Sequence, residues 1–187
     1  MEIFISIAVT ILVFFLLHRI GNNDGEKNNI VPESKENIKR DRGEQTQEEC
    51  IELCMKVLRS MNCKVERDKE ATNKLDFKYQ GGNFSIFCGS KLIEIWFMFW
   101  YEIDLDDIDR LAKARRIIND LNLDCPTPCV SYVINDELQK MYIHSSAGTV
   151  FINEIPALDD LMGSYFDRFF EKANKFTMRM ATEEKAE

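Results

Sequence analysis

The chain has 187 residues and a formal net charge of −8, and 45% of its residues are hydrophobic. Its length fits one domain with an appendage, and its hydrophobic fraction is normal for a globular protein. The acidic balance, without a basic stripe interleaved with aromatic residues, disfavours nucleic-acid binding.

The first 20 residues are predicted to form a transmembrane anchor. Residues 3–17 read IFISIAVTILVFFLL, in which only Ser6 and Thr10 are polar. As a helix continued to Ile20, the segment spans about 27 Å, slightly less than the roughly 30 Å hydrocarbon core of a bilayer. Arg19 can reach the interface at one end. A cleaved signal peptide is the alternative, but it requires positive charge before the apolar run and a small-residue cleavage site after it.

A charged linker is predicted over residues 21–45. Its few apolar side chains bury too little surface to offset the entropy of ordering the segment. Lys and Arg are in excess after the anchor, with a cluster at Lys39, Arg40 and Arg42. The positive-inside rule therefore predicts a single-pass membrane protein whose C-terminal domain lies in the cytoplasm. Contact of the same cluster with anionic lipid headgroups is a second interpretation.

Residues 46–180 are predicted to form one α+β domain, followed by a frayed tail at 181–187. Apolar residues at helical spacing predict a first helix over residues 45–61, where Thr46 and Glu49 form a capping box. A second helix is expected over residues 106–122. A third begins with Pro156 in its first turn.

Alternating hydrophobicity predicts strands over residues 74–80, 83–88 and 92–103, joined as an antiparallel meander. A short strand near residues 64–67 precedes them. Gly81-Gly82 is interpreted as the first turn, because glycine accepts the positive φ of a two-residue hairpin. This register sets Phe77 opposite Ile86, and the next turn sets Ile86 opposite Ile93.

A further hairpin is expected from strands at 129–135 and 138–144. The predicted fold class is therefore α+β, with an antiparallel sheet made of a three-stranded meander plus a hairpin. Three helices pack on one face of the sheet, in the order α-β-β-β-α-β-β-α, after one transmembrane helix.

The strand at 92–103 carries the most informative surface. Its odd-numbered residues form a continuous apolar row, so its even-numbered residues are expected to face away from the helices. The partner-binding residues predicted on that face are Glu94, Trp96, Met98, Trp100 and Glu102. An aromatic and methionine patch among polar neighbours is typical of a protein contact surface. The alternative is that the last helix or the second hairpin covers this patch.

The cysteines and histidines give no recognised catalytic or metal-binding motif. Cys50 and Cys54 lie on the apolar face of the first helix, so buried free thiols are expected in a cytoplasmic domain. We assign no catalytic residue, metal ligand or cofactor. The alternative function is an enzyme or a metal-dependent site built from Cys125, Cys129 and His144.

Three segments carry a resemblance to a known family: LDFKYQGGNFSIFCGSKLIEIWFMFWYEID at 75–104, ARRIINDLN at 114–122, and CVSYVINDELQKMYIHSS at 129–146. In the order of their elements and in their pattern of hydrophobic residues, residues 46–178 resemble the YbjN-like domains, which share a fold with type III secretion chaperones. The resemblance implies a non-enzymatic, often dimeric, protein-binding domain. We therefore expect a membrane-tethered interaction module with a regulatory or chaperone-like role, whose partner is another protein or a second copy.

Overall fold

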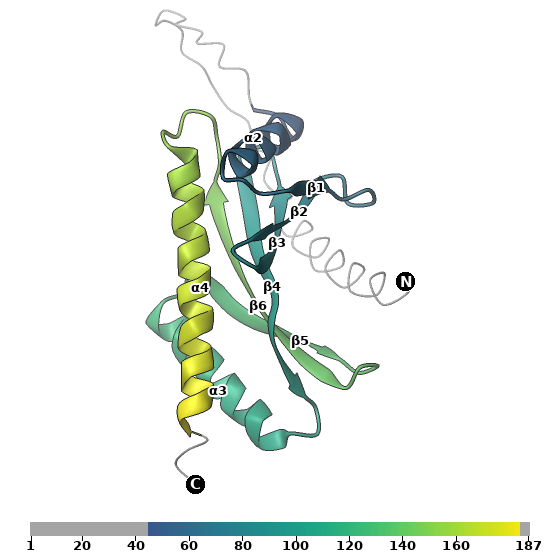
Figure 1. Cartoon of the computed structure of the whole chain (residues 1–187), viewed down its shortest axis with the longest axis vertical. Helices are drawn as coiled ribbons and strands as arrows, with labels where there is room; N and C mark the ends of the chain where they lie inside the picture. Colours follow the sequence, from purple (N-terminus) through teal and green to yellow (C-terminus); the bar gives the residue numbers. More distant parts are fainter. Residues whose placement is uncertain (1–44, 184–187) are drawn as a thin grey trace, which may run out of the picture. The chain divides into compact units, whose positions relative to one another are not determined.

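The computed structural model describes residues 45–183, which form an α+β domain around one six-stranded antiparallel sheet (Figure 1). In chain order the elements are α2 (Gln47–Ser60), β1 (Val65–Arg67), β2 (Lys74–Tyr79), β3 (Gly82–Cys88), β4 (Leu92–Asp104), α3 (Ile108–Asp124), β5 (Cys129–Asn135), β6 (Lys140–Val150) and α4 (Leu158–Glu183). The predicted anchor and nearly all of the predicted linker lie outside the described residues. Within 45–183, none of the helices combines the length and apolarity that a membrane crossing requires.

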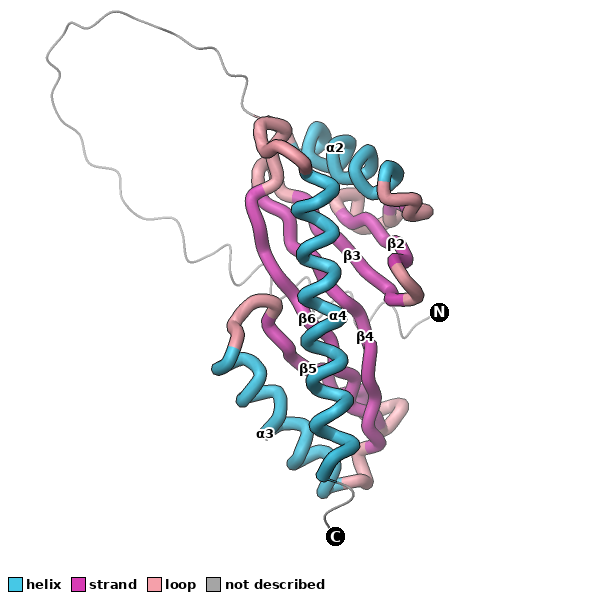
Figure 2. Tube along the Cα trace, turned by 60° about the vertical axis from the view of Figure 1, so that its left-hand side comes forward, coloured by secondary structure: helices cyan, strands magenta, loops and turns pink. Residues whose placement is uncertain are grey.

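The strands lie in the order β1-β2-β3-β4-β6-β5, with every neighbouring pair antiparallel. The meander therefore has four strands, because the short β1 pairs with β2 at one edge. The second hairpin joins the same sheet, since β6 continues to Val150 and pairs along β4. All three helices pack on one face of this sheet (Figures 1 and 2).

The helix ends follow local chemistry. Thr46 and Glu49 form the predicted capping box: the Glu49 amide donates to Thr46 Oγ1 at 3.2 Å, and the Thr46 amide donates to Glu49 Oε2 at 2.7 Å. Asp107 caps α3 by accepting from the Arg110 amide. The last helix begins at Leu158, two residues after Pro156, and it runs to Glu183. The helix therefore includes the first three residues of the predicted tail at 181–187, and the rest of that tail lies outside the described residues.

The first hairpin turn lies one residue earlier than predicted. Gln80 and Gly81 form it, with φ values of 46° and 84°, which suits a turn that requires positive φ at both central residues. Gly82 is the first residue of β3, and a Cβ atom there would lie 2.8 Å from a ring carbon of Phe97. The two glycines therefore serve different purposes, one in the turn and one in close packing.

The predicted strand registers are each wrong by two residues. Phe77 pairs with Phe84, and Ile86 pairs with Ile95, instead of the expected partners Ile86 and Ile93. Because side chains alternate with a period of two, a shift of two keeps every residue on its predicted face. The prediction of the buried face was thus confirmed for β2, for β3 and for β4 up to Phe97, despite the wrong register.

Two clusters of buried apolar side chains fill the space between the helices and the sheet. The cluster nearer α2 includes Phe84, Ile95, Phe166 and Phe169. The cluster nearer α3 includes Ile103, Ile118, Ile143 and Phe176. Helix α4 contributes to both clusters, and Trp100 of β4 packs against both.

Candidate interaction surface

The face of the sheet opposite α2, α3 and α4 is called the outer face below. Cross-strand pairing fixes which side chains share it. Trp96 lies opposite Ser85 of β3 and Ser146 of β6, whereas the adjacent Phe97 points to the core. Within residues 45–183 all six strands belong to one sheet, and the three helices lie on its opposite face (Figure 1).

A bulge in β4 changes which residues reach the outer face. The pairing of β4 with β6 shifts between Phe97 and Tyr101, where three residues of β4 lie opposite His144 alone. Phe99 has a left-handed backbone, with φ of 46°, and its ring contacts Tyr142 and His144 at centroid distances of 5.4 and 6.4 Å. Bulges re-aim side chains in this way. Phe99 therefore lies on the outer face, although strict alternation placed it in the core.

The same bulge overturns the prediction for Trp100. Its ring packs on the helix side against Phe97 and Phe176, at centroid distances of 6.2 and 5.3 Å, and its indole N–H donates to Ser145 Oγ at 3.1 Å. Trp100 is thus a core residue between the two clusters. The alternative that the last helix covers the patch holds for this one residue.

An apolar row remains on the outer face, and it includes residues that the sequence analysis did not choose. Trp96 and Met98 are partly buried, whereas Leu92, Phe99 and Val150 have exposed fractions of 60%, 38% and 47%. Leu92 and Val150 form a cross-strand pair at one end of β4. We call these five residues, with Tyr142 and His144, the outer-face row.

Polar side chains flank the row and interrupt it at Glu94. Glu94 is on the outer face opposite Phe87 and Gly148. Glu102 is also on that face, and its carboxylate accepts from Lys140 at 2.6 Å. Ser85 is buried and donates to Asp76 at 2.5 Å. An apolar centre with a polar border is the usual arrangement of protein interfaces.

His144 is a polar group with an incomplete set of partners. Its Nε2 atom lies 2.9 Å from Ser131 Oγ, and its ring lies 5.1 Å from that of Trp96. Neither His144 Nδ1 nor Trp96 Nε1 has a hydrogen-bond partner within the described domain, although both atoms are shielded from solvent. Burial lowers the pKa of His144 from 6.5 to about 4, so the imidazole is neutral at physiological pH.

The structure does not assemble the alternative site of Cys125, Cys129 and His144. Cys125 ends α3 and Cys129 begins β5, and both thiols are exposed. His144 pairs with Ser131 on the neighbouring strand. These three residues do not form a group of three ligand atoms within 4.8 Å of one another; among residues 45–183 only Cys50, Cys54 and Cys88 do so.

Cys50, Cys54 and Cys88 are called the thiol cluster below. The sequence predicted buried thiols but not their convergence. Cys50 and Cys54 are buried on α2 as expected, but Cys88 at the end of β3 meets them, with Cys54 Sγ and Cys88 Sγ 3.8 Å apart. Hydrogen bonding from Cys54 and Cys88 lowers the pKa of Cys50. The contact with Cys50 raises the pKa values of Cys54 and Cys88.

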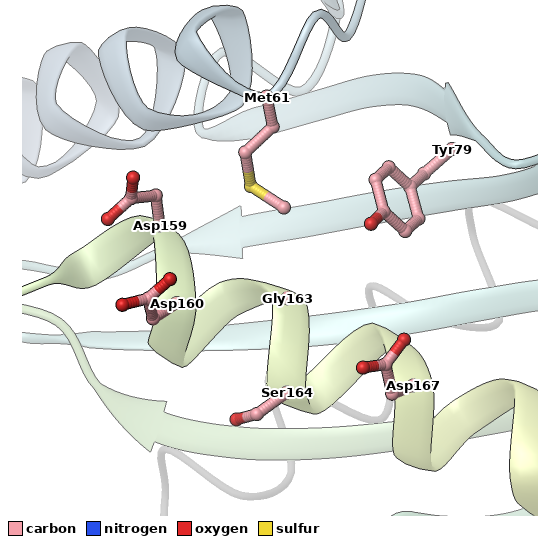
Figure 3. A pocket seen from close by; sticks show the side chains of 7 residues that line it. All are labelled: Met61, Tyr79, Asp159, Asp160, Gly163, Ser164 and Asp167. Atoms are coloured by element: carbon pink, nitrogen blue, oxygen red, sulfur yellow. The ribbon is translucent and has the colours of Figure 1, made fainter.

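A shallow pocket of about 450 Å³ lies along the first turns of α4 (Figure 3). Asp159, Asp160, Ser164 and Asp167 line it from the helix, and Met61 and Tyr79 lie across from them. The Ser164 hydroxyl donates to the Leu161 carbonyl, one turn back in its own helix. The hydroxyl is therefore engaged within its own helix, and this bond is not to an aspartate of the pocket.

No protein-family model and no curated protein matches the chain. A solved structure of an uncharacterized protein from Methanothermobacter thermautotrophicus is similar, with a TM-score of 0.49 and 11% sequence identity. The similarity covers 71% of this chain and 96% of that chain. A likeness this distant supports no inference about function.

Proposed function

We propose that this protein is a membrane-tethered interaction module that binds another protein, or a second copy of itself, through the outer face of its sheet. The outer-face row is the observation that carries the proposal. It places exposed Leu92, Phe99 and Val150 on the same face of the sheet as Trp96, on the side away from the three helices; Glu94 lies between Leu92 and Trp96. Exposed large apolar side chains gathered on one face of a soluble domain often mark a contact surface for a partner.

The unpaired polar atoms in the row support the same proposal. Buried N–H groups and ring nitrogens are almost always hydrogen-bonded in proteins, because leaving one unpaired costs about 1–3 kcal/mol. The indole N–H of Trp96 can donate, and Nδ1 of His144 can donate or accept according to its tautomer. Because both atoms are shielded from solvent, a partner would complete these bonds only by displacing the side chains that cover them.

The membrane tether and the family resemblance complete the proposal. Residues 3–20 would hold the domain at a bilayer, with the linker at 21–45 allowing it to reach a partner and the domain in the cytoplasm. The likeness to YbjN-like domains favours a regulatory or chaperone-like role over catalysis. The acidic chain is not expected to bind nucleic acid.

A paired set of variants tests this function. Replacing Leu92 with Ser and Phe99 with Gly removes exposed apolar surface, while glycine suits the positive φ at position 99. We expect the double variant to keep its fold and to weaken association about tenfold or more, as loss of central interface residues does. Pull-down with a differently tagged second copy measures self-association, and co-purification of the full chain from detergent extracts measures a different partner.

Met178→Ser is the matched control, because Met178 is 67% exposed on α4, which packs on the other face of the sheet. Its association should equal that of the unaltered chain. Equal association by the double variant and the unaltered chain, with thermal unfolding unchanged, would contradict the proposed use of the outer face.

A further inference from the structure

Three cysteine side chains converge in the core where the first turns of α2 cross the end of β3. Cys50 and Cys54 lie one helical turn apart, and Cys88 is the last residue of β3. Their Sγ atoms all lie within 4.8 Å of one another, and each residue is at most 1% exposed. We propose that the thiol cluster is a three-thiolate site for a thiophilic divalent metal ion, namely Zn²⁺.

The spacing of the sulfurs fits such an ion. Thiolate sulfur binds Zn²⁺ at about 2.3 Å, so three sulfurs around one ion lie roughly 3.8–4.0 Å from each other. Cys54 Sγ and Cys88 Sγ are already 3.8 Å apart. Because all separations are within 4.8 Å, the other pairs need to close by no more than about 1 Å. Small rotations of the side chains can provide this change.

The local charge favours a divalent ion. Three thiolates around a divalent ion carry one net negative charge, whereas a monovalent ion would leave two in a buried site, where charge is costly. Cys50 lies in the second turn of α2, close to the helix N-terminus that Thr46 caps. The partial positive charge of a helix N-terminus stabilises thiolate nearby.

A backbone carbonyl oxygen lies beside the thiol cluster, whereas the fourth ligand of zinc is usually thiolate, imidazole, carboxylate or water. The carbonyl oxygen of Phe151 lies 3.9 Å from Cys50 Sγ. The side-chain amide of Gln45 donates to this oxygen at 3.0 Å and to the Ser90 carbonyl at 2.8 Å. Gln45 therefore ties the chain before α2 to the loops beside the thiol cluster and closes this end of the core.

The competing explanation is that the thiols pack as small apolar side chains, for which 3.8 Å is also an ordinary contact distance. The two explanations differ in metal binding. A packed cluster retains no ion after desalting, whereas a three-thiolate site retains one ion per chain. Because the thiols are sealed from solvent, the ion would enter as the protein folds.

The experiment uses the full chain in mild detergent, with Cys125 and Cys129 replaced by Ser to remove the exposed thiols. The protein is refolded with Zn²⁺ or with Cd²⁺, a thiophilic probe whose thiolate complexes absorb in the ultraviolet. After desalting, elemental analysis should find one ion per chain with either metal. The cadmium sample should also show sulfur-to-metal charge-transfer absorbance.

Cys54→Ser should abolish retention of the ion, and Cys88→Ala is a second variant in case the first does not fold. Cys63→Ser is the matched control, because Cys63 is also buried but lies outside the thiol cluster. It should retain the ion in full. The proposal fails if the parent retains no ion, if Cys63→Ser loses it as the cluster variants do, or if folded cluster variants keep it. Retention of Cd²⁺ but not Zn²⁺ would overturn the assignment to zinc.

Discussion

His144 shows how burial at one residue couples the outer face to pH. The ring is 9% exposed and has a hydrogen bond through Nε2 to Ser131, while its neighbours Trp96 and Phe99 offer aromatic surface. Desolvation penalises the imidazolium, which is why the pKa falls to about 4. The folded domain therefore binds a proton at this site less readily than the unfolded chain.

The pH dependence of stability follows from that difference. Between pH 6.5 and 4 the unfolded chain binds more protons at His144, so the free energy of unfolding should fall as the pH falls through this window. The loss should approach about 3 kcal/mol near pH 4. Urea unfolding of the unaltered chain and of His144→Gln, measured from pH 7 to 4, tests it. Parallel pH profiles for the two proteins would contradict the assignment.

Lys172 links secondary-structure elements: it joins α4 to the connection between α3 and β5. Its side chain is buried, and its ammonium donates to the carbonyls of Cys125 and Pro128 and to Asn122 Oδ1. Burial lowers the pKa of Lys172. The Asn122 side chain also bonds the backbone of Val130 in both directions, at 2.9 and 2.8 Å. One buried cation thus holds the loop to two helices.

We expect Lys172→Met to lower the free energy of unfolding by about 2–3 kcal/mol, because it leaves carbonyl oxygens of the loop without their donor. Lys175→Met is the control on the same helix. Lys175 pairs with Glu171 at 2.7 Å, but both side chains are exposed, so its loss should have no measurable effect. Chemical denaturation at neutral pH measures both. Equal stability of the two variants would show that the buried bonds of Lys172 add nothing.

The helices and the buried faces of the strands were predictable because they depend on local patterns. The period-two alternation of β2 and β3 survives a register error of two residues, so Phe77 and Ile86 face the core as expected. The capping box at Thr46 and Glu49 is likewise a local pattern, and it was confirmed. The position of the turn between β2 and β3 was less predictable, because Gly81 and Gly82 can both adopt the positive φ that such a turn requires.

The bulge and the thiol cluster were not predictable from local patterns. Residues 97–101 contain neither glycine nor proline, and a bulky residue such as Phe99 seldom adopts positive φ, so nothing marked the reversal that sends Trp100 inward. The thiol cluster depends on α2 crossing the end of β3, a contact between residues far apart in sequence. Both features arise from tertiary packing.

At the scale of the whole molecule, the domain separates its core from a candidate contact surface. Helix α4 and Trp100 connect the two clusters on one face of the sheet, and the outer-face row lies on the other. The outer-face row is expected to contact a protein in the cell. This contact can be tested in intact cells, and the test does not require the partner to be known.

The most direct measurement is site-specific photo-crosslinking of the full chain in intact cells, with a benzophenone amino acid at position 99 or, in a separate strain, at position 178. Both side chains are exposed, but only Phe99 belongs to the outer-face row. We predict a discrete protein adduct from position 99, whether with a second copy or another protein, and none from position 178. No adduct from position 99, or the same adduct from both positions, would show that the outer-face row is not a specific contact surface.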